Sequence, residues 1–293
     1  MGVKGLGKLI RSKIPSAIQT ISLASLRDQK IAIDANYFFN KYHIGYNSIP
    51  ASTRPPDRNE HIERKFHQQY MHLRRYRIQP IFFFDGRVPD LKKDEIAHRR
   101  IRLQRRNGVS IKQDDYAKLR QALIRYRIPY IDCPTEADFI MAVLSQTGYI
   151  HGIISDDMDM LPLGCTHLYR GYTTRSETLE YYNLSIILSQ LTMTGLIDLC
   201  IYLGCDYGFR IQEYVYECNT IDVLDLFKTY NTIERIVEHF QETGRFRLDK
   251  IEARDPTYFE TYQATLKPIR ELFQCPYNDT EMKEFIAKNR NIL

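Results

Sequence analysis

The chain has 293 residues, of which 43% are hydrophobic and 26% charged, a composition that fits a globular protein and excludes a disordered or fibrous one. No apolar run is long enough to span a bilayer, and the first residues lack the apolar segment of a secretory signal. We therefore expect an intracellular protein that is neither secreted nor held in a membrane. The six cysteines form no zinc-ligand pattern, so free thiols in a reducing compartment are expected.

Charge is distributed unevenly along the chain. Residues 1–130 contain 27 Lys and Arg against 11 Asp and Glu, whereas the remainder contains 14 against 25. The segment 87–127 alone holds 13 basic and 5 acidic residues. A basic region of this kind favours a polyanionic partner, with nucleic acid as the first candidate. The alternative interpretation is an ordinary solvated surface. We rank it lower, because the basic residues are concentrated in one part of the chain.

Short apolar runs alternate with helix-like stretches along the first half of the chain. Strands are predicted at 30–33, 80–84 and 152–154, because compact apolar runs are typical of parallel strands covered on both faces. A proline-rich loop is expected at 50–58, and the chain from about Leu184 is predicted to be mostly helical. Apolar residues at helical spacing predict helices around Phe66, Tyr70 and Leu73, around Leu119, Leu123 and Tyr126, and around Ile140, Met141 and Leu144. This alternation indicates an α/β fold with a mainly parallel central sheet flanked by helices.

Acidic residues follow each of the three predicted strands. Asp34 and Asp85 end the first two, and Asp156, Asp157 and Asp159 follow the third. Functional groups of open α/β sheets gather beyond the carboxyl ends of the strands, so these acids are expected to converge. Their mutual repulsion is tolerable if divalent cations neutralise it, and Mg²⁺ prefers oxygen ligands. One such Asp would be weak evidence, since it could simply begin a turn or cap a helix.

Three further acids are ambiguous when each is taken alone. Glu136 and Asp138 lie in a segment where Thr135 and Asp138 fit a capping box at a helix start. The negative charge of Glu136 would then interact favourably with the positive end of the helix dipole. Asp206 follows a helical run and would alone indicate a turn.

The motifs in chain order resemble those of the flap endonucleases, a family of structure-specific 5′-nucleases. They are MGVKGLGKLI, IAIDAN, FFFDGRVPDLKKDEIAHRR, IPYIDCPTEAD, SDDMDML and LGCDY, and the resemblance covers nearly the whole chain. It implies a PIN-like 5′-nuclease fold with a helical arch, a helical C-terminal part and one compact catalytic domain. Within that domain we expect an N-terminal nuclease region at 1–106, a shortened arch segment at 107–128, an internal nuclease region with a degenerate DNA-binding turn at 129–240, and a C-terminal extension at 241–293.

The resemblance also implies roles for particular residues. Asp34, Asp85, Glu136 and Asp138 would hold one metal ion, and Asp138, Asp157, Asp159 and Asp206 the second, with Asp138 bridging. The ions would be Mg²⁺, with Mn²⁺ as a substitute. Lys92 and Arg99, seven residues apart on one predicted helix face, match the family's two basic residues at the scissile phosphate. Gly2 would lie near the active site once Met1 is removed. The additional DNA contacts expected are Arg100, Arg105, Arg106 and Lys112.

The implied function is a 5′ flap endonuclease and 5′–3′ exonuclease on branched DNA in replication, repair or recombination. The products would carry a 5′-phosphate and a 3′-hydroxyl. Alternatives are a Holliday-junction resolvase or a 5′–3′ exoribonuclease of the same superfamily, and, less favoured, a non-catalytic nucleic-acid-binding scaffold. We expect a monomer located in the nucleus or at a site of viral DNA replication.

The chain departs from the family pattern in several places. The arch is shorter than in most cellular members, a compactness compatible with a member encoded by a large DNA virus. The glycine-rich turn that grips duplex phosphates around a monovalent cation is replaced by residues 208–217, so we expect that ion site to be lost. Asn40 stands where the family has a stacking tyrosine, with Tyr37 or Phe38 as substitutes. No C-terminal aromatic clamp motif is present, which leaves a sliding-clamp partner open.

Overall fold

The computed structural model describes residues 2–3, 5–92, 111–206, 223–243, 258–274 and 279–293. The chain divides into two compact units, each discontinuous in sequence. Unit 1 comprises Met1–Gln19, Asp156–Leu168 and Tyr182–Asn278. Unit 2 comprises Thr20–Ser155, Tyr169–Tyr181 and Asp279–Leu293.

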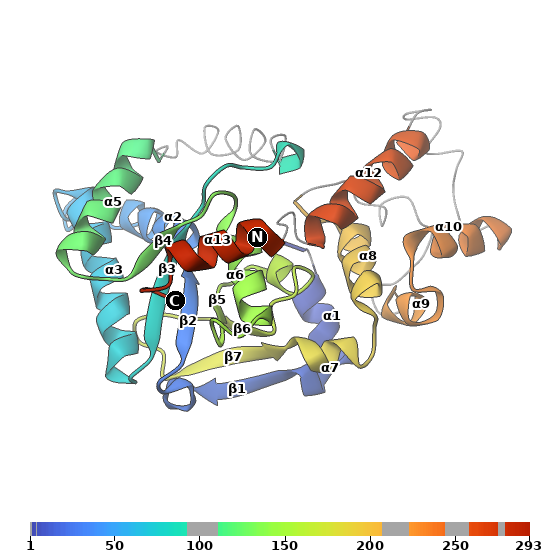
Figure 1. Cartoon of the computed structure of the whole chain (residues 1–293), viewed down its shortest axis with the longest axis horizontal. Helices are drawn as coiled ribbons and strands as arrows, with labels where there is room; N and C mark the ends of the chain where they lie inside the picture. Colours follow the sequence, from blue (N-terminus) through green and yellow to red (C-terminus); the bar gives the residue numbers. More distant parts are fainter. Residues whose placement is uncertain (1, 4, 93–110, 207–222, 244–257, 275–278) are drawn as a thin grey trace. The chain divides into compact units, whose positions relative to one another are not determined.

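A seven-stranded sheet runs through the described residues in the order β1-β7-β6-β5-β2-β3-β4 (Figure 1). Its strands are β1 (Ile18–Ser22), β2 (Lys30–Asp34), β3 (Gln79–Phe84), β4 (Tyr130–Asp132), β5 (Gly152–Ile154), β6 (His167–Arg170) and β7 (Thr178–Asn183). β2 pairs in parallel with β3 and with β5, and β3 pairs in parallel with β4. The carboxyl ends of β5, β2, β3 and β4 therefore share one edge of the sheet.

The alternation of side chains along these strands divides the core of unit 2 between the two sheet faces. Ile31 and Ile33 of β2 join Phe82 and Phe84 of β3 in one large buried cluster. The intervening residues point to the other face, since successive strand side chains alternate. Both sets are buried. Burial on both faces explains why β2 and β3 are nearly continuous apolar runs rather than alternating ones.

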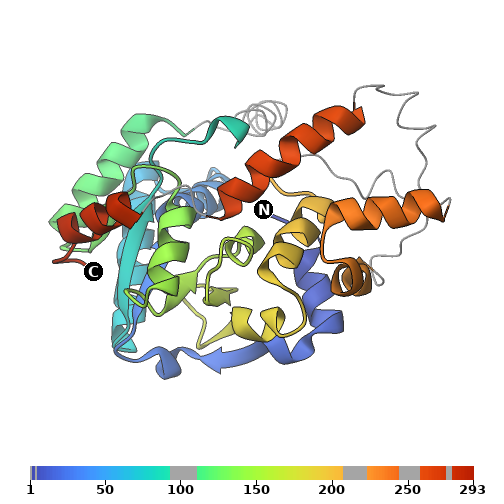
Figure 2. The same cartoon turned by 45° about the vertical axis from the view of Figure 1, so that its right-hand side comes forward.

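Helices cover both faces of the central strands in unit 2. α2 (Ala35–Asn47), α3 (Arg58–Arg75) and α5 (Gln113–Arg125) lie on one face, and α6 (Ala137–Gln146) lies on the other (Figures 1 and 2). α3 places Phe66 and Leu73 in the core, and α5 places Leu119 and Leu123 there. α5 lies within the segment 107–128 that was predicted as the arch, and it packs as part of unit 2. α13 (Asp279–Lys288) also belongs to unit 2.

Unit 1 is mainly helical. It contains α1 (Leu6–Lys13), α7 (Leu184–Leu188), α8 (Met193–Leu203), α9 (Val223–Tyr230), α10 (Ile233–Glu242) and α12 (Tyr258–Phe273). Short 3₁₀ turns occur at η1 (Pro15–Ala17) and η4 (Met158–Met160) of unit 1, and at η2 (Leu23–Leu26) and η3 (Asp90–Lys92) of unit 2. α8 is largely apolar and is buried from Gly195 to Leu203, as expected for a helix inside a bundle.

The α/β fold with a mainly parallel central sheet is confirmed, as are the three predicted strands and the helical character of the chain after Leu184. The sequence did not predict β1, β4, β6 and β7. The helix predicted around Leu119, Leu123 and Tyr126 is α5, which ends one residue before Tyr126; Tyr126 is 40% exposed. Among the described residues, no helix combines the length and the apolar character needed to cross a membrane.

Candidate metal centre and nuclease site

In unit 2, two of the predicted ligands lie at the carboxyl edge of the sheet and also cap helices. Asp34 ends β2, and its Oδ1 accepts the Tyr37 N–H at 2.8 Å, capping α2. Asp85 directly follows β3, and its Oδ1 accepts the N–H of Ala137, the first residue of α6, at 2.8 Å. The helix-cap and metal-ligand interpretations of these acids are thus compatible, because the cap bond fixes the orientation of each carboxylate.

The turn after Asp85 requires glycine. A Cβ on Gly86 would overlap the backbone of Cys133 and Pro134, and the Gly86 N–H donates to the Thr135 carbonyl at 2.7 Å. This close approach brings the segment before α6 against the end of β3. It therefore places Glu136 and Asp138 beside Asp85.

The predicted capping box at the start of α6 is wrong. The helix begins at Ala137, Glu136 occupies the N-cap position without a side-chain cap bond, and the Thr135 hydroxyl donates to the Arg87 carbonyl at 3.2 Å. Asp85, from a different strand, supplies the cap instead. Local sequence could not reveal this, because the capping group is 52 residues away.

Lys92 neutralises part of this acidic group. Its Nζ donates to Glu136 Oε1 at 2.5 Å, and both side chains are largely buried. Burial raises the pKa of the Asp85 carboxyl; the Ala137 N–H opposes this, the charge of Glu136 adds to it, and Lys92 opposes it. The ammonium group of Lys92 therefore balances part of the negative charge of Glu136 and Asp85.

The buried thiol of Cys133 indicates that the four acids of unit 2 are close together. Burial is the main cause that raises its pKa, and the charges of Asp85, Asp132, Asp138 and Asp34 raise it further. Three of the four predicted ligands of unit 2 thus act on one side chain, and the fourth, Glu136, acts on Asp85.

In unit 1, the other three predicted ligands form a tight cluster. Asp157, Asp159 and Asp206 each offer a carboxylate oxygen, and these oxygens all lie within 4.8 Å of one another. Asp157 and Asp159 are buried, and Asp157 Oδ1 accepts the Asp159 N–H at 3.1 Å. Asp206 follows α8 after Gly204, which closes that helix with a φ of 93°.

Gly2 lies against the same cluster. Its φ is +76°, and a Cβ built on it would overlap Asp157 Oδ1 and come to 3.0 Å from Asp159 Oδ1. The backbone at Gly2 is therefore in direct proximity to two of the carboxylates. A side chain at this position would displace at least one of these carboxylates and would strain the left-handed backbone.

The donor set of the unit 1 cluster fits a hard divalent cation. Three carboxylates converge, and two of them are buried. Oxygen-only donors suit Mg²⁺ or Mn²⁺ better than softer metals. Buried like charges at this spacing would otherwise repel strongly, which a divalent ion relieves.

One aromatic residue beside the carboxylates was not predicted from the sequence. Tyr116 of α5 packs on Phe39 with ring centroids 4.7 Å apart and is hydrogen-bonded to the side chain of Asn40. Burial raises the pKa of its hydroxyl, and the charges of Asp85 and Asp34 raise it further. Of the predicted substitutes, Phe38 is buried in the core and Tyr37 is half-buried against it. The helical spacing of α5 gave no sign that Tyr116 would face two strand ends.

Several predicted DNA contacts lie outside the described residues, namely Arg99, Arg100, Arg105 and Arg106. The departure from the glycine-rich turn at 208–217 also lies outside them. Lys112 is described: it is exposed and forms the N-cap of α5.

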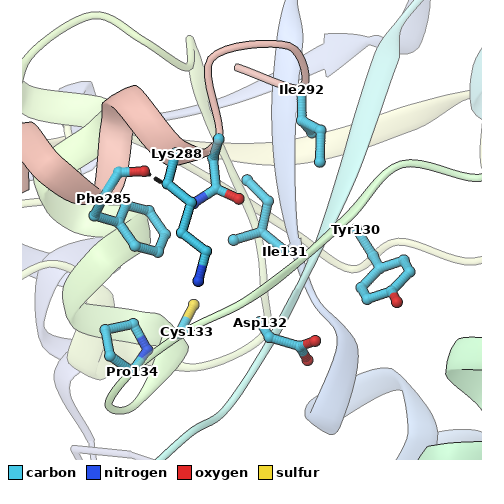
Figure 3. Close-up of a pocket in the computed structure, with 9 residues that line it drawn as sticks. Tyr130, Ile131, Asp132, Cys133, Pro134, Phe285, Lys288 and Ile292 are labelled. Atoms are coloured by element: carbon cyan, nitrogen blue, oxygen red, sulfur yellow. Dashed lines mark hydrogen bonds between the residues drawn. The ribbon is translucent and has the colours of Figure 1, made fainter.

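A cavity of about 510 Å³ lies elsewhere in unit 2, between the edge strand β4 and helix α13 (Figure 3). Phe285 and Lys288 of α13 line it together with Asp132 and Cys133, and the Lys288 side chain extends toward Cys133. None of the seven predicted carboxylate ligands lines this cavity.

Comparison with known proteins shows the family to which the chain is related. Residues 1–108 match the model of the XPG N-terminal domain, and residues 127–206 match that of the XPG I-region. The chain is 32% identical over 272 residues to Flap endonuclease 1 of Saccharomyces cerevisiae (strain RM11-1a), covering 83% of this chain and 69% of that protein.

Solved structures share the fold. The catalytic core of Rad2 in complex with DNA substrate aligns with a TM-score of 0.70 at 19% identity, covering 100% of this chain and 99% of that one. Human GEN1 in complex with Holliday junction DNA aligns with a TM-score of 0.64 at 16% identity, covering 99% of this chain and 74% of that one.

Proposed function

Because the chain belongs to the flap endonuclease and XPG family of nucleases, we propose that it cleaves branched DNA at 5′ flaps and acts as a 5′–3′ exonuclease. The protein is a phosphodiester hydrolase. The observation that most supports the proposed metal-dependent cleavage is the cluster of Asp157, Asp159 and Asp206, against which Gly2 lies. Acids at strand ends held by helix caps are what a metal-dependent hydrolase needs.

The carboxylates would hold two divalent ions, Mg²⁺ by preference. Asp34, Asp85, Glu136 and Asp138 of unit 2 would serve one, and Asp157, Asp159 and Asp206 of unit 1 the other. Such ions, when bound, supply an activated water and stabilise the attacking and leaving oxygens of the phosphodiester. The products would carry a 5′-phosphate and a 3′-hydroxyl.

The other residues around the acids would orient the nucleic acid. Lys92 forms an ion pair with Glu136 and would stabilise charge on the scissile phosphate, together with Arg99. Tyr116 has an aromatic ring beside Asp34 and Asp85 and would pack against the nucleotide there. If so, the Tyr116→Phe variant should keep most of the cleavage rate, and the Tyr116→Ala variant should cleave much more slowly. Equal cleavage rates for the two variants would show that the ring does not contact the substrate.

The experiment that tests the proposal is cleavage of a panel of end-labelled substrates in Mg²⁺, mapped to one nucleotide. The panel contains a 5′ flap, a nick, a Holliday junction and an RNA flap of the same sequence. We expect the flap to be cut fastest, near the branch, and Asp157→Asn and Asp159→Asn to abolish cutting. Cleavage that is insensitive to both substitutions would refute the proposed metal centre.

A junction-resolving activity is the second candidate. The fold likeness to GEN1, solved with Holliday junction DNA, supports it. Faster cleavage of the junction than of the flap, by paired symmetrical cuts, would favour it. We propose that the protein acts where DNA is replicated and repaired, in the nucleus or at a site of viral DNA replication, and as a monomer.

A further inference from the structure

Two helices of unit 2 end in the same four residues. Residues 75–78 at the end of α3 and residues 125–128 at the end of α5 both read Arg-Tyr-Arg-Ile. In each, the tyrosine is the C-cap, the second arginine has a positive φ of 61° or 54°, and the isoleucine is buried. The isoleucine N–H donates to the leucine carbonyl five residues earlier, at 3.2 Å in α3 and 2.9 Å in α5. Each helix thus closes with a left-handed cap motif.

An arginine is a costly choice for the left-handed position of such a cap. Glycine adopts this conformation without strain, and side chains with a Cβ do not. Arg77 has a structural use, since its guanidinium donates to both carboxylate oxygens of Asp28, at 3.0 and 3.1 Å. Arg127 is exposed and forms no ion pair with any residue that the structure describes. The backbone alone therefore does not explain why an arginine is present at 127.

The two motifs lie on the edge of the sheet opposite to Asp85. Each precedes a strand, β3 and β4 respectively, and these strands are parallel neighbours. Their amino ends therefore share one edge, whereas Asp85 follows the carboxyl end of β3. β3 has six residues, so its length separates the two edges by roughly 20 Å.

An aromatic and basic surface surrounds Arg127. The Tyr126 ring is 40% exposed and packs on His67 of α3, with centroids 4.6 Å apart and planes at 34°. The Arg125 guanidinium lies 5.3 Å from the centre of the Tyr126 ring and donates to Glu63 at 2.6 Å. Glu63 is thereby already neutralised. Arg75 and Arg127 therefore give this surface a net positive charge.

Exposed apolar side chains extend the same surface. Of the five large hydrophobic residues that the described structure exposes most, two lie here: Met71 and Tyr126. Met71 is one helical turn after His67 on α3, and Arg75 is one turn further, so the three share a helix face. We call His67, Met71, Arg75, Tyr126 and Arg127 the edge patch.

We propose that the edge patch binds unpaired nucleotides of a nucleic-acid strand. A base would stack on the Tyr126 ring, which accepts any base because every base has a flat apolar face. Arg75 and Arg127 would contact the flanking phosphates. A duplex could use the cations but would leave the aromatic pair and Met71 without partners. This binding goes beyond the proposed cleavage, since it requires neither metal ions nor the carboxylates.

The chain contains no tryptophan, which allows a direct test of stacking. A Tyr126→Trp variant is titrated with oligo(dT) in EDTA, and its fluorescence reports on this position alone. We expect saturable quenching. The matched control is Tyr149→Trp, because Tyr149 is 43% exposed and precedes β5, which is separated from β4 by β2 and β3 in the sheet. Absence of quenching at 126, or equal quenching at both positions, would overturn the proposal.

Substitutions separate binding from a purely structural role. Arg127→Gly suits the left-handed backbone, so Tm should not fall, yet affinity for oligo(dT) should drop at least threefold; Tyr126→Ala should lower it similarly. Lys283→Ala, at an exposed lysine of α13, is the control and should bind like the wild type. A stabilised Arg127→Gly variant with unchanged affinity would identify the arginine as neutral and refute the proposal.

Two further arms define the ligand. A hairpin duplex with the same number of phosphates should bind more weakly, and its binding should be less sensitive to Tyr126→Ala; equal sensitivity would reject stacking. Comparison of oligo(dT) with oligo(rU) shows whether DNA or RNA is preferred. The edge-patch variants should cleave a short-flap substrate at the wild-type rate, so failure of this proposal leaves the proposed nuclease function intact.

Discussion

Three of the carboxylates proposed as metal ligands also hold the backbone. Asp34, Asp85 and Asp157 each accept a backbone N–H that begins a helix or 3₁₀ turn. Such a bond fixes the direction of the carboxylate before any ion binds, which reduces the ordering cost of binding. From the sequence, a helix cap and a metal ligand were the two interpretations of Glu136 and Asp138; the observed cap of α6 comes from Asp85, whose proposed ligand role is compatible with it.

Gly2 allows a sharp test at this scale. We expect Gly2→Ala to lower the cleavage rate at least tenfold, because the added methyl group would overlap Asp157 Oδ1. Gly5→Ala is the matched control: Gly5 has a φ of +79°, so it carries the same backbone strain, but nothing lies within 4 Å of its added Cβ. Single-turnover rates and Tm are measured for both. Equal losses of activity would attribute the effect to backbone strain and not to the carboxylates.

Lys92 is the second residue with a specific expectation. Lys92→Ala should lower the single-turnover cleavage rate by orders of magnitude with a smaller effect on DNA affinity, because a cation aimed at the transition state acts on the chemical step. The substitution also leaves Glu136 without its partner at 2.5 Å, so Tm should change as well. A lower Tm with a normal cleavage rate would make the ion pair structural only.

At the scale of elements, a buried ion-pair network joins three helices of unit 1. Asp198 of α8 is fully buried and accepts the Arg270 Nε–H of α12 at 2.6 Å and the Ile233 N–H of α10 at 3.0 Å. Arg270 also donates to both oxygens of Glu234, each at 2.7 Å. Because α8 leads to Asp206, this network also supports one of the predicted metal ligands.

Removal of the central arginine should be costly. Arg270→Ala leaves the Asp198 charge buried and unpaired, and we expect a loss of about 3–5 kcal/mol in the free energy of unfolding. Lys267→Ala is the control on the same helix, where the ion pair to Glu271 at 3.9 Å is exposed and is expected to contribute less than about 1 kcal/mol. Urea denaturation measures both. Similar losses for the two variants would contradict the special role of Arg270.

The elements that the sequence predicted are those whose pattern is set by burial on both faces. β2 and β3 are buried apolar runs and were found, whereas β1 has no buried residue, β7 has two buried residues among partly exposed ones, and β4 has only three residues. Tyr116 and the cap of α6 by Asp85 were not predictable, since both depend on segments that meet only in the folded protein. The positions of Asp34 and Asp85 at one edge of the sheet were predictable, because each ends or follows an apolar run typical of a buried parallel strand.

Protonation should affect the whole molecule through its buried histidines. Burial is the main cause that lowers the pKa of His43, His61, His72 and His151 below 6.5; for His43 the charge of Arg58 lowers it further, while Asp115 raises it. Below pH 6.5 the unfolded chain takes up protons that the folded chain does not. The stability present above that pH is therefore lost as the pH falls through the folded pKa values.

We accordingly expect a lower Tm at pH 5.5 than at pH 7.5. His43→Leu should reduce this difference, because it removes one buried titrating group at a position that is 3% exposed. Thermal melts of both proteins in buffers of matched ionic strength provide the comparison. A wild-type Tm that is constant over this range, or an unreduced difference in the variant, would contradict the expectation.

The charge asymmetry of the chain sets the expected salt dependence. Residues 1–130 hold 27 of the 41 basic residues, so DNA affinity should depend on phosphate contacts from this region. Each neutralised phosphate releases counterions and adds roughly 0.9 to the slope of log affinity against log salt. Binding should therefore weaken steeply with total salt, whichever monovalent cation is present.

The identity of the monovalent cation should matter little, and this follows from the altered turn after Asp206. A family member with the glycine-rich turn holds the duplex through backbone amides around a monovalent ion. Residues 208–217, which lie outside the described residues, contain Gln212, Glu213 and Glu217 there and lack the paired glycines. Negative charge and bulk at this position oppose close approach of a phosphate. Titrations of flap DNA in KCl and NaCl at matched concentrations should give the same affinity; a clear preference for K⁺ would show that this chain builds the ion site from other residues.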